Sequence, residues 1–190
     1  MRRVLVLLAA FALGAIQAPS AQAQNAETAR DGQHDFDFEI GTWRTHLRLL
    51  QNPMTGEPAT WAEYEGTTTV REVWGGRSNL VEFDVSGPAG RIELLSLRLY
   101  NPQTRQWSLH AGSSRSGTLF PPVIGAFEDG RGEFYGTDTT GDGRAILARF
   151  VISQAAPDTW RFEQAFSGDG GRTWEVNWIV EDTRIDDGTP

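Results

Sequence analysis

Two runs of alternating apolar and polar side chains flank a glycine-rich turn near the end of the chain. The first run covers residues 159–167 and the second covers residues 172–183. Successive side chains of a β-strand point to opposite faces, so a period of two is typical of a sheet that is buried on one side. The glycines between the runs accept the positive φ angles of a tight turn. This segment therefore predicts a β-hairpin with one apolar face, formed by Trp160, Phe162, Phe166, Trp174, Val176, Trp178 and Val180.

Similar alternating runs, separated by clusters of turn residues, fill most of the chain. We expect strands at roughly residues 38–50, 61–73, 78–85, 92–100, 106–111, 119–127, 132–138, 144–152, 159–167 and 172–183. Short turns join antiparallel neighbours only, because a parallel crossover needs about a dozen residues or more. Closing such a meander pairs its two edge strands. The sequence therefore predicts an all-β fold, an antiparallel up-and-down β-barrel of about ten strands.

The apolar faces of these strands should point into the barrel, because a lone barrel has no second layer to cover an apolar exterior. Trp43 and Thr45 share one face of their strand, opposite Arg44 and His46. Polar residues that interrupt apolar faces could orient the polar end of a ligand. We predict a lumen that binds a ligand through Trp43, Thr45, Arg98, Tyr100, Trp107, Gln164 and Trp178.

Arg98 lies on a strand that is otherwise rich in leucine. An arginine inside the lumen needs a partner, because an isolated buried charge costs several kcal/mol. Glu63, Glu65 and Glu163 are candidates for an internal partner. The alternative partner is the carboxylate or phenolate of a bound ligand.

Several short motifs resemble those of known families. The Gly-x-Trp at residues 41–43 resembles the motif by which lipocalin-like, or calycin, barrels close one end with a tryptophan. The chain also resembles a bacterial family of exported domains of unknown function, of the type labelled 1579. The resemblance implies a lipocalin-like barrel, supplies no established catalytic residues to carry over, and leaves the activity open. Its motifs are His34-Asp35-Phe36-Asp37-Phe38, Val73-Trp74-Gly75-Gly76, residues 96–102, Arg105-Gln106-Trp107, Gly132-Glu133-Phe134-Tyr135, residues 162–167 and Asn177-Trp178.

Residues 167–174 have the pattern Ser-x-Asp-x-Gly-x-Thr-Trp, which is called an Asp box in sialidase-like propellers. The pattern occurs once, whereas a propeller would repeat it in successive blades. We therefore interpret it as a structural hairpin and not as a sign of glycosidase activity.

The first 23 residues have the pattern of a signal peptide. Arg2 and Arg3 precede an apolar stretch, and Ala21-Gln22-Ala23 is typical of a cleavage site. The stretch has about thirteen residues, fewer than the roughly twenty of a membrane span. We expect a signal peptide at 1–23, a flexible leader at 24–33 and one barrel domain at 34–186. The product would be periplasmic or secreted, without a membrane span.

Charge and motifs argue against several partners and cofactors. Removing Arg2 and Arg3 takes the formal net charge from −8 to about −10, which disfavours nucleic acid and anionic lipid as partners. The histidines lack the spacing of a metal site, so no metal is expected. We find no nucleotide or cofactor motif either and expect no cofactor. Strands 92–100 and 144–152 are apolar on both faces, a pattern compatible with a homodimer.

Three functions remain open at this stage. The first is an exported barrel that binds a small apolar or aromatic molecule, which could carry a carboxylate. The second is a cofactor-free isomerase, cyclase or lyase that uses His46, His110 or Glu163, although alternation places both histidines outside the lumen. The third is a structural or interaction module with a solidly packed lumen.

Overall fold

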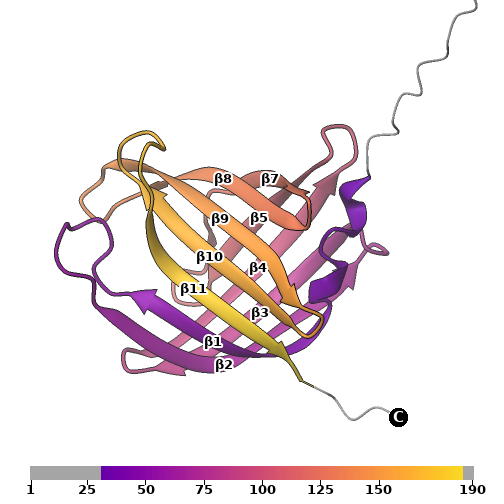
Figure 1. Ribbon diagram of the computed structural model, residues 1–190, viewed down its shortest axis with the longest axis horizontal. Coiled ribbons are helices and arrows are strands. Elements are labelled where there is room, and N and C mark those ends of the chain that lie inside the picture. Colours follow the sequence, from indigo (N-terminus) through magenta and orange to yellow (C-terminus); the bar gives the residue numbers. More distant parts are fainter. Residues whose placement is uncertain (1–30, 186–190) are drawn as a thin grey trace, which may run out of the picture. The chain divides into compact units, whose positions relative to one another are not determined.

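All ten predicted strands appear in the computed structural model, which describes residues 31–185 (Figure 1). Two short 3-10 helices, η1 (Gly32–His34) and η2 (Asp37–Glu39), precede the strands. Within residues 31–185, no helix has the length and apolar character needed to cross a membrane. The strands are β1 (Gly41–Leu50), β2 (Trp61–Val73), β3 (Ser78–Gly87), β4 (Gly90–Asn101), β5 (Gln106–Ser113), β6 (Thr118–Leu119), β7 (Val123–Glu128), β8 (Arg131–Thr139), β9 (Ala145–Ala156), β10 (Thr159–Ser167) and β11 (Glu175–Arg184).

The strands form a closed antiparallel barrel in which almost every strand pairs with its neighbours in the sequence. Pairing of β1 with β11 closes the ring, and β4 pairs with β5. The short strand β6 adds to the end of β5. Ten strands make up the ring, so the prediction of an up-and-down barrel of about ten strands is confirmed.

The predicted strand 119–127 is interrupted by Pro121 and Pro122. Proline has no backbone N–H, so it cannot complete the ladder in the middle of a sheet. The amide of Phe120 still donates to the carbonyl of Ala111 at 2.7 Å, and regular pairing resumes where Val123 meets Leu109. Prolines therefore split one predicted strand into β6 and β7.

A β-bulge breaks the alternation in the predicted hairpin 160–178. Gln164 pairs with Trp178, but the next residue, Ala165, pairs with Val176, so Asn177 is the extra residue. Val176 therefore shares the face of Ala165 and not that of Trp178. The expectation of one continuous apolar face from residue 174 to residue 180 is wrong for this reason.

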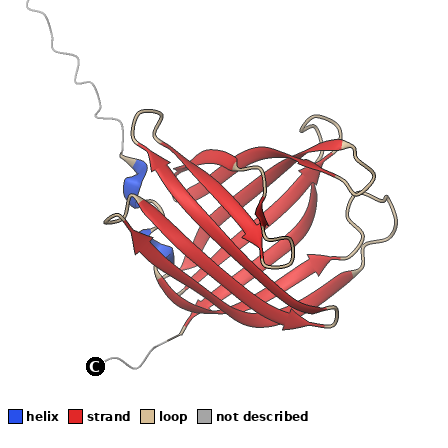
Figure 2. Ribbon diagram, turned by 180° about the vertical axis from the view of Figure 1, so that it is seen from behind, coloured by secondary structure: helices blue, strands red, loops and turns tan. Residues whose placement is uncertain are grey.

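Residues 31–40 cover one end of the barrel, and we call them the N-terminal plug. Figure 2 shows the two short helices of the plug beside the ends of the strands. Trp107 donates its indole N–H to the carbonyl of Gly32 at 2.9 Å, and Arg184 donates to the carbonyls of Phe38 and Ile40 at 3.0 and 2.9 Å. Phe36 is fully buried against the barrel core. These contacts hold the plug against strands from different parts of the ring.

Two sequence expectations concern the same region. Residues 38–40 are not part of the first strand, because they belong to η2 and its C-cap. Of the predicted leader, Asp31 caps η1, and Gly32 and Gln33 lie in it. The predicted signal peptide, residues 1–23, and residues 24–30 of the leader lie outside the described residues, as does residue 186.

The turn between β10 and β11 has the hydrogen bonds of a structural Asp box. The Asp169 carboxylate accepts the amides of Arg172 and Thr173, both at 3.0 Å, and the Thr173 hydroxyl at 2.7 Å. The Ser167 hydroxyl oxygen accepts the amide of Gly171 at 2.8 Å. Each of these bonds stays within the turn, which confirms the structural interpretation.

This turn should make stability fall in acid. Hydrogen bonds from Thr173 and its backbone amide lower the pKa of Asp169 from 3.8 to about 2. Because the folded pKa is lowered, the contribution is complete above about pH 4 and is lost as the pH falls toward about 2. We expect Asp169→Asn to be less stable than wild type at neutral pH, with the difference shrinking toward about pH 2. Urea unfolding at several pH values measures this, and a difference independent of pH would contradict it.

Candidate functional site

A cavity of about 440 Å³ lies inside the barrel. Most of its wall consists of inward-facing side chains, which come from most of the strands of the ring. The apolar part of the lining comprises Val81, Phe83, Ile92, Leu94, Leu95, Leu109, Ala111, Val123, Ala148, Phe150, Ile152, Trp160, Phe162, Trp178 and Val180. The cavity therefore offers an apolar surface to any molecule that enters it.

The cavity runs toward the end of the barrel opposite the plug. Phe120 and Pro121 line it there, just after the end of β5, and Thr137 and Asp138 line it at the end of β8. Neighbouring strands of the ring run in opposite directions, so β1 and β5 run in the same direction. The end of β5 therefore lies away from the start of β1. The plug precedes β1, so it closes the other end.

Three of the predicted ligand-binding residues line the cavity, namely Arg98, Gln164 and Trp178. Gln164 uses its amide N–H to donate to the Asn177 side chain at 2.8 Å, a bond that the bulge makes available. Thr45 does not line the cavity but lies beside Thr68, which does.

The other three predicted residues, Trp43, Tyr100 and Trp107, belong to the closed end and not to the cavity wall. The indole of Trp43 donates to the carbonyl of Glu39, and the hydroxyl of Tyr100 accepts the amide of Gly32 at 3.0 Å. They point inward as predicted, but the plug packs on them. The three residues thus contact the plug and do not line the cavity.

A buried ion pair joins the plug to the cavity floor. Arg98 donates to the Glu39 carboxylate at 2.8 Å, and the two side chains are 5% and 0% exposed. The guanidinium also lies 4.2 Å from the centre of the Phe36 ring, a cation–π distance. Both partners of Arg98 come from the plug, so the arginine holds the plug and lines the cavity at once.

The structure corrects the predicted partner of Arg98. Glu63 and Glu65 lie outside the barrel, 3.9 and 3.8 Å from His46. Glu163 also faces outward and pairs with Arg161 at 3.2 Å. Period-two alternation on β2 and β10 sends these glutamates to the outer face. The actual partner, Glu39, precedes the first strand, where alternation carries no information.

A second buried carboxylate, Asp182, lies close to this pair. Burial, together with the nearby charge of Glu39, raises the pKa of Asp182 to about 7, against the hydrogen bonds of Thr45 and Thr68 and the charge of Arg98. Burial also raises the pKa of Glu39, against the attraction of Arg98. No described residue donates a hydrogen bond to Oδ2 of Asp182 or Oε1 of Glu39. The floor of the cavity is therefore polar and ionisable beneath an apolar wall.

Asp182 and Thr68 were missed by the sequence analysis, although alternation contains a signal for both. Asp182 follows the inward residues Trp178 and Val180 at a spacing of two. It pairs with the inward-facing Trp160 of β10. Thr68 is likewise separated by an even number of positions from Tyr64 and Val70, which are buried residues of β2.

The histidines lie away from the cavity. His110 is 3.1 Å from the Ser108 hydroxyl on the outer face of β5, and His34 is 2.9 Å from Asp37 in the plug. Among residues 31–185, no three or more histidine or acidic side chains are grouped so that they could hold a metal ion.

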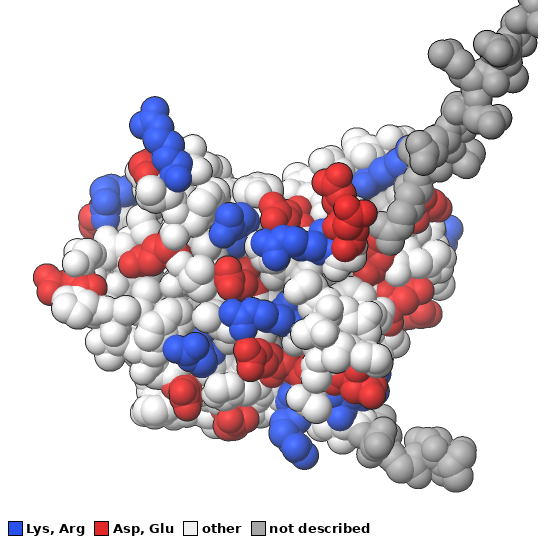
Figure 3. Space-filling model, in the orientation of Figure 1, with Lys and Arg blue, Asp and Glu red and all other residues white. Residues whose placement is uncertain are grey.

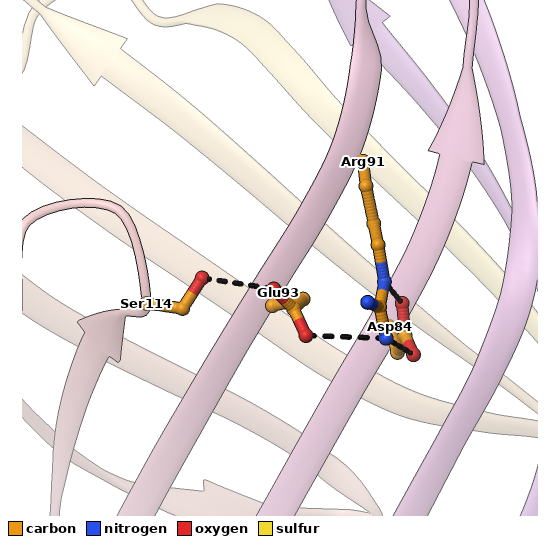
Figure 4. A network of polar contacts seen from close by, with 4 residues as sticks. All are labelled: Asp84, Arg91, Glu93 and Ser114. Carbon is orange, nitrogen blue, oxygen red and sulfur yellow. Dashed lines mark hydrogen bonds and ion pairs between the residues drawn. The ribbon is translucent and has the colours of Figure 1, made fainter.

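The outer wall carries mixed charges and a second hollow. On the face shown in Figure 3, acidic and basic side chains are interspersed. The hollow, of about 590 Å³, lies beside Asp84, Glu93 and Leu119. Arg91 donates to Asp84 at 2.7 and 2.6 Å and pairs with Glu93 at 3.1 Å, while Ser114 donates to Glu93 at 3.2 Å (Figure 4). These carboxylates already have partners, so the hollow presents no unpaired charge there.

Comparisons with known proteins give weak structural likenesses. Neither a protein-family model nor a curated protein matches the chain. Among solved structures, an S-type phycobiliprotein lyase from Guillardia theta shares 13% identity at a TM-score of 0.47, over 83% of this chain and 94% of the lyase. A de novo designed fluorescence-activating β-barrel shares 15% identity at a TM-score of 0.42, over 82% of this chain and 99% of the design.

A redesigned β-barrel bound to the small molecule DFHBI shares 10% identity at a TM-score of 0.42. That match covers 82% of this chain and all of the design, at 100%. At these values no property of the three proteins is carried over to this chain. The resemblance to the family of exported domains stays a prediction.

The Glu39–Arg98 pair should be worth far more to stability than the ion pairs of the outer wall. Glu39→Gln leaves the Arg98 charge buried without a counter-charge, at a cost of about 3–5 kcal/mol. The matched change Glu163→Gln, on the outer wall, should cost about 0–1 kcal/mol. Urea denaturation followed by tryptophan fluorescence measures both. Equal effects of the two changes would contradict a sealing role for Glu39.

Proposed function

We propose that this protein binds a small, uncharged, apolar or aromatic molecule inside its barrel. The single observation that carries the proposal is the cavity of about 440 Å³, apolar along its wall and closed by the plug at one end. Ligand pockets commonly have volumes of about 300–1,000 Å³, apolar linings and a few polar groups that fix orientation. The polar groups of the lining include Arg98, Gln164 and Thr68.

The charge of the floor supports an uncharged ligand over a carboxylate. Arg98 already has Glu39 as its counter-charge. A ligand carboxylate would therefore bring a further negative charge next to Glu39 and Asp182, in a site where burial penalises charge. The proposed ligand therefore carries no carboxylate, although a ligand carboxylate was one of the two predicted partners of Arg98.

The two other functions receive less support from the geometry. The open volume inside the barrel argues against a solidly packed module. His46, His110 and Glu163 do not line the cavity, so none of them can act on a molecule bound there without a rearrangement. We therefore do not extend the proposal to an isomerase, cyclase or lyase reaction with these groups.

We further propose that the barrel acts outside the cytoplasm, in the periplasm or as a secreted protein. The support is the signal-peptide pattern of residues 1–23. A homodimer stays a prediction. Leu95 and Ile124 are exposed on the outer wall, which is compatible with it.

Filling the cavity should abolish binding without unfolding the protein. Ala111 lines the cavity, whereas Ala126 is exposed on the outer face of β7. We expect ethylnaphthalene to bind wild type and Ala126→Phe with equal affinity. It should bind Ala111→Phe at least about tenfold more weakly, because the new phenyl ring occupies the space that the probe needs. Isothermal titration calorimetry measures the affinities.

Thermal unfolding of the three proteins controls for the fold. If folded Ala111→Phe binds the probe as tightly as wild type, the interior is not the binding site. If wild type binds neither this probe nor any co-purifying apolar molecule detected by native mass spectrometry, the proposed function is wrong.

A further inference from the structure

We infer that the cavity recognises a hydroxyl group of its ligand through a chain of hydrogen bonds, Thr68 to Thr45 to Asp182. The inference rests on the proposed function and names the class of ligand, an uncharged aromatic or apolar alcohol or phenol. It uses three side chains whose hydrogen bonds the proposed function leaves unexplained.

The three side chains come from three adjacent strands, β2, β1 and β11. Thr68 lines the cavity, and its hydroxyl oxygen lies 2.7 Å from that of Thr45. Thr45 donates to Oδ1 of Asp182 at 2.5 Å and stands directly opposite Asp182 in the β1–β11 ladder. The three side chains are buried from bulk solvent, with exposed fractions of 1%, 0% and 1%. The chain therefore leads from the cavity wall to a buried carboxylate.

The direction of the chain follows from counting protons. A threonine hydroxyl has one proton to donate and two lone pairs that accept. Thr45 gives its proton to Asp182, so Thr68 gives its own proton to Thr45 or to Asp182, with which it also forms a hydrogen bond. The proton of Thr68 is then used, and only its lone pairs remain for a ligand. A ligand that bonds to Thr68 must bring a donor, such as a hydroxyl.

The other charges around Asp182 explain why the donor should be neutral. The charged groups that act on Asp182 are Glu39 of the plug and Arg98 of β4, and they form a pair with each other. Trp160, opposite Asp182 on β10, carries no charge. The ionised floor thus has an excess of one negative charge, which repels an anionic ligand. A hydroxyl satisfies Thr68 without adding charge.

The preference for a donor should weaken in acid. The pKa of Asp182 is raised to about 7, so the carboxylate binds a proton as the pH falls through that value. A protonated Asp182 can donate to Thr45, which lets both threonines reverse their bonds. Thr68 would then offer its proton to the cavity and keep one lone pair, so an acceptor without a proton, such as an ether oxygen, could also bond to it. The preference for a hydroxyl over an ether oxygen should therefore be full well above pH 7 and decline below it.

Naphthalenemethanol and ethylnaphthalene are two probes of matched shape that test the inference. They differ only in that the first has a hydroxyl group where the second has a methyl group. Thr68→Val removes the hydroxyl of the threonine and keeps its shape. At about pH 9 we expect it to weaken naphthalenemethanol about threefold to tenfold and to leave ethylnaphthalene unchanged or tighter. Thr68→Ser should retain the preference. Thr67→Val, one residue away on the outer face of β2, should change neither affinity.

Calorimetry on the wild-type protein gives an independent readout. Between about pH 9 and about pH 5, the affinity for naphthalenemethanol relative to methoxynaphthalene, whose oxygen can only accept, should fall, and Asp182→Asn should remove this pH dependence. This comparison decides the question even if Thr68→Val does not fold.

The outcomes distinguish failure of the hydroxyl site from failure of the binding cavity. If both probes bind but Thr68→Val affects them equally, the hydroxyl site is wrong and the binding cavity stands. The same holds if the ratio of the naphthalenemethanol affinity to the methoxynaphthalene affinity is constant with pH. If neither probe binds the folded wild type, the proposed function fails together with the inference.

Discussion

The ion pair between Glu39 and Arg98 is the interaction on which the rest of this structure depends. A barrel of ten strands satisfies its own backbone hydrogen bonds but leaves both ends open. Here one end is closed by residues 31–40, and the pair ties that segment to the inside of β4. Without a seal the lumen would be a channel for water. With the seal it becomes a cavity with a floor, and the floor is where the polar groups gather.

The same pair sets the electrostatics of the site. A lone arginine in an apolar barrel would attract an anion, and Arg98 has this appearance in the sequence. Once Glu39 neutralises it, the remaining charge on the floor is that of Asp182, whose pKa is raised to about 7 by burial. In the function that we propose, this floor favours neutral molecules with a donor over anions. Closure of the barrel and the proposed choice of ligand would then both follow from one contact.

Most of the fold could be predicted because alternation with a period of two is a local property. The bounds of β2 and β10 were predicted to the residue, and the ring of antiparallel neighbours follows from short turns. The exceptions have local physical causes that alternation does not report. Pro121 and Pro122 divide a strand, Asn177 forms a bulge, and the residues before Gly41 adopt 3-10 turns.

The site was harder to predict, because alternation gives the face of a side chain but not its height along the barrel axis. Trp43 and Trp107 point inward as expected, yet they lie at the level of the plug and not of the cavity. Arg98 and Gln164 were correctly singled out as polar interruptions of apolar faces. The partner of Arg98 required knowledge of where the plug folds, which no periodic pattern contains.

The most direct test of this account is to locate a bound probe by isotope-filtered nuclear Overhauser spectroscopy. Ethylnaphthalene protons should show contacts with Ile152, Phe162 and Val180, which line the interior cavity. Contacts with Thr118 and Leu119, which line the outer hollow, would contradict the account.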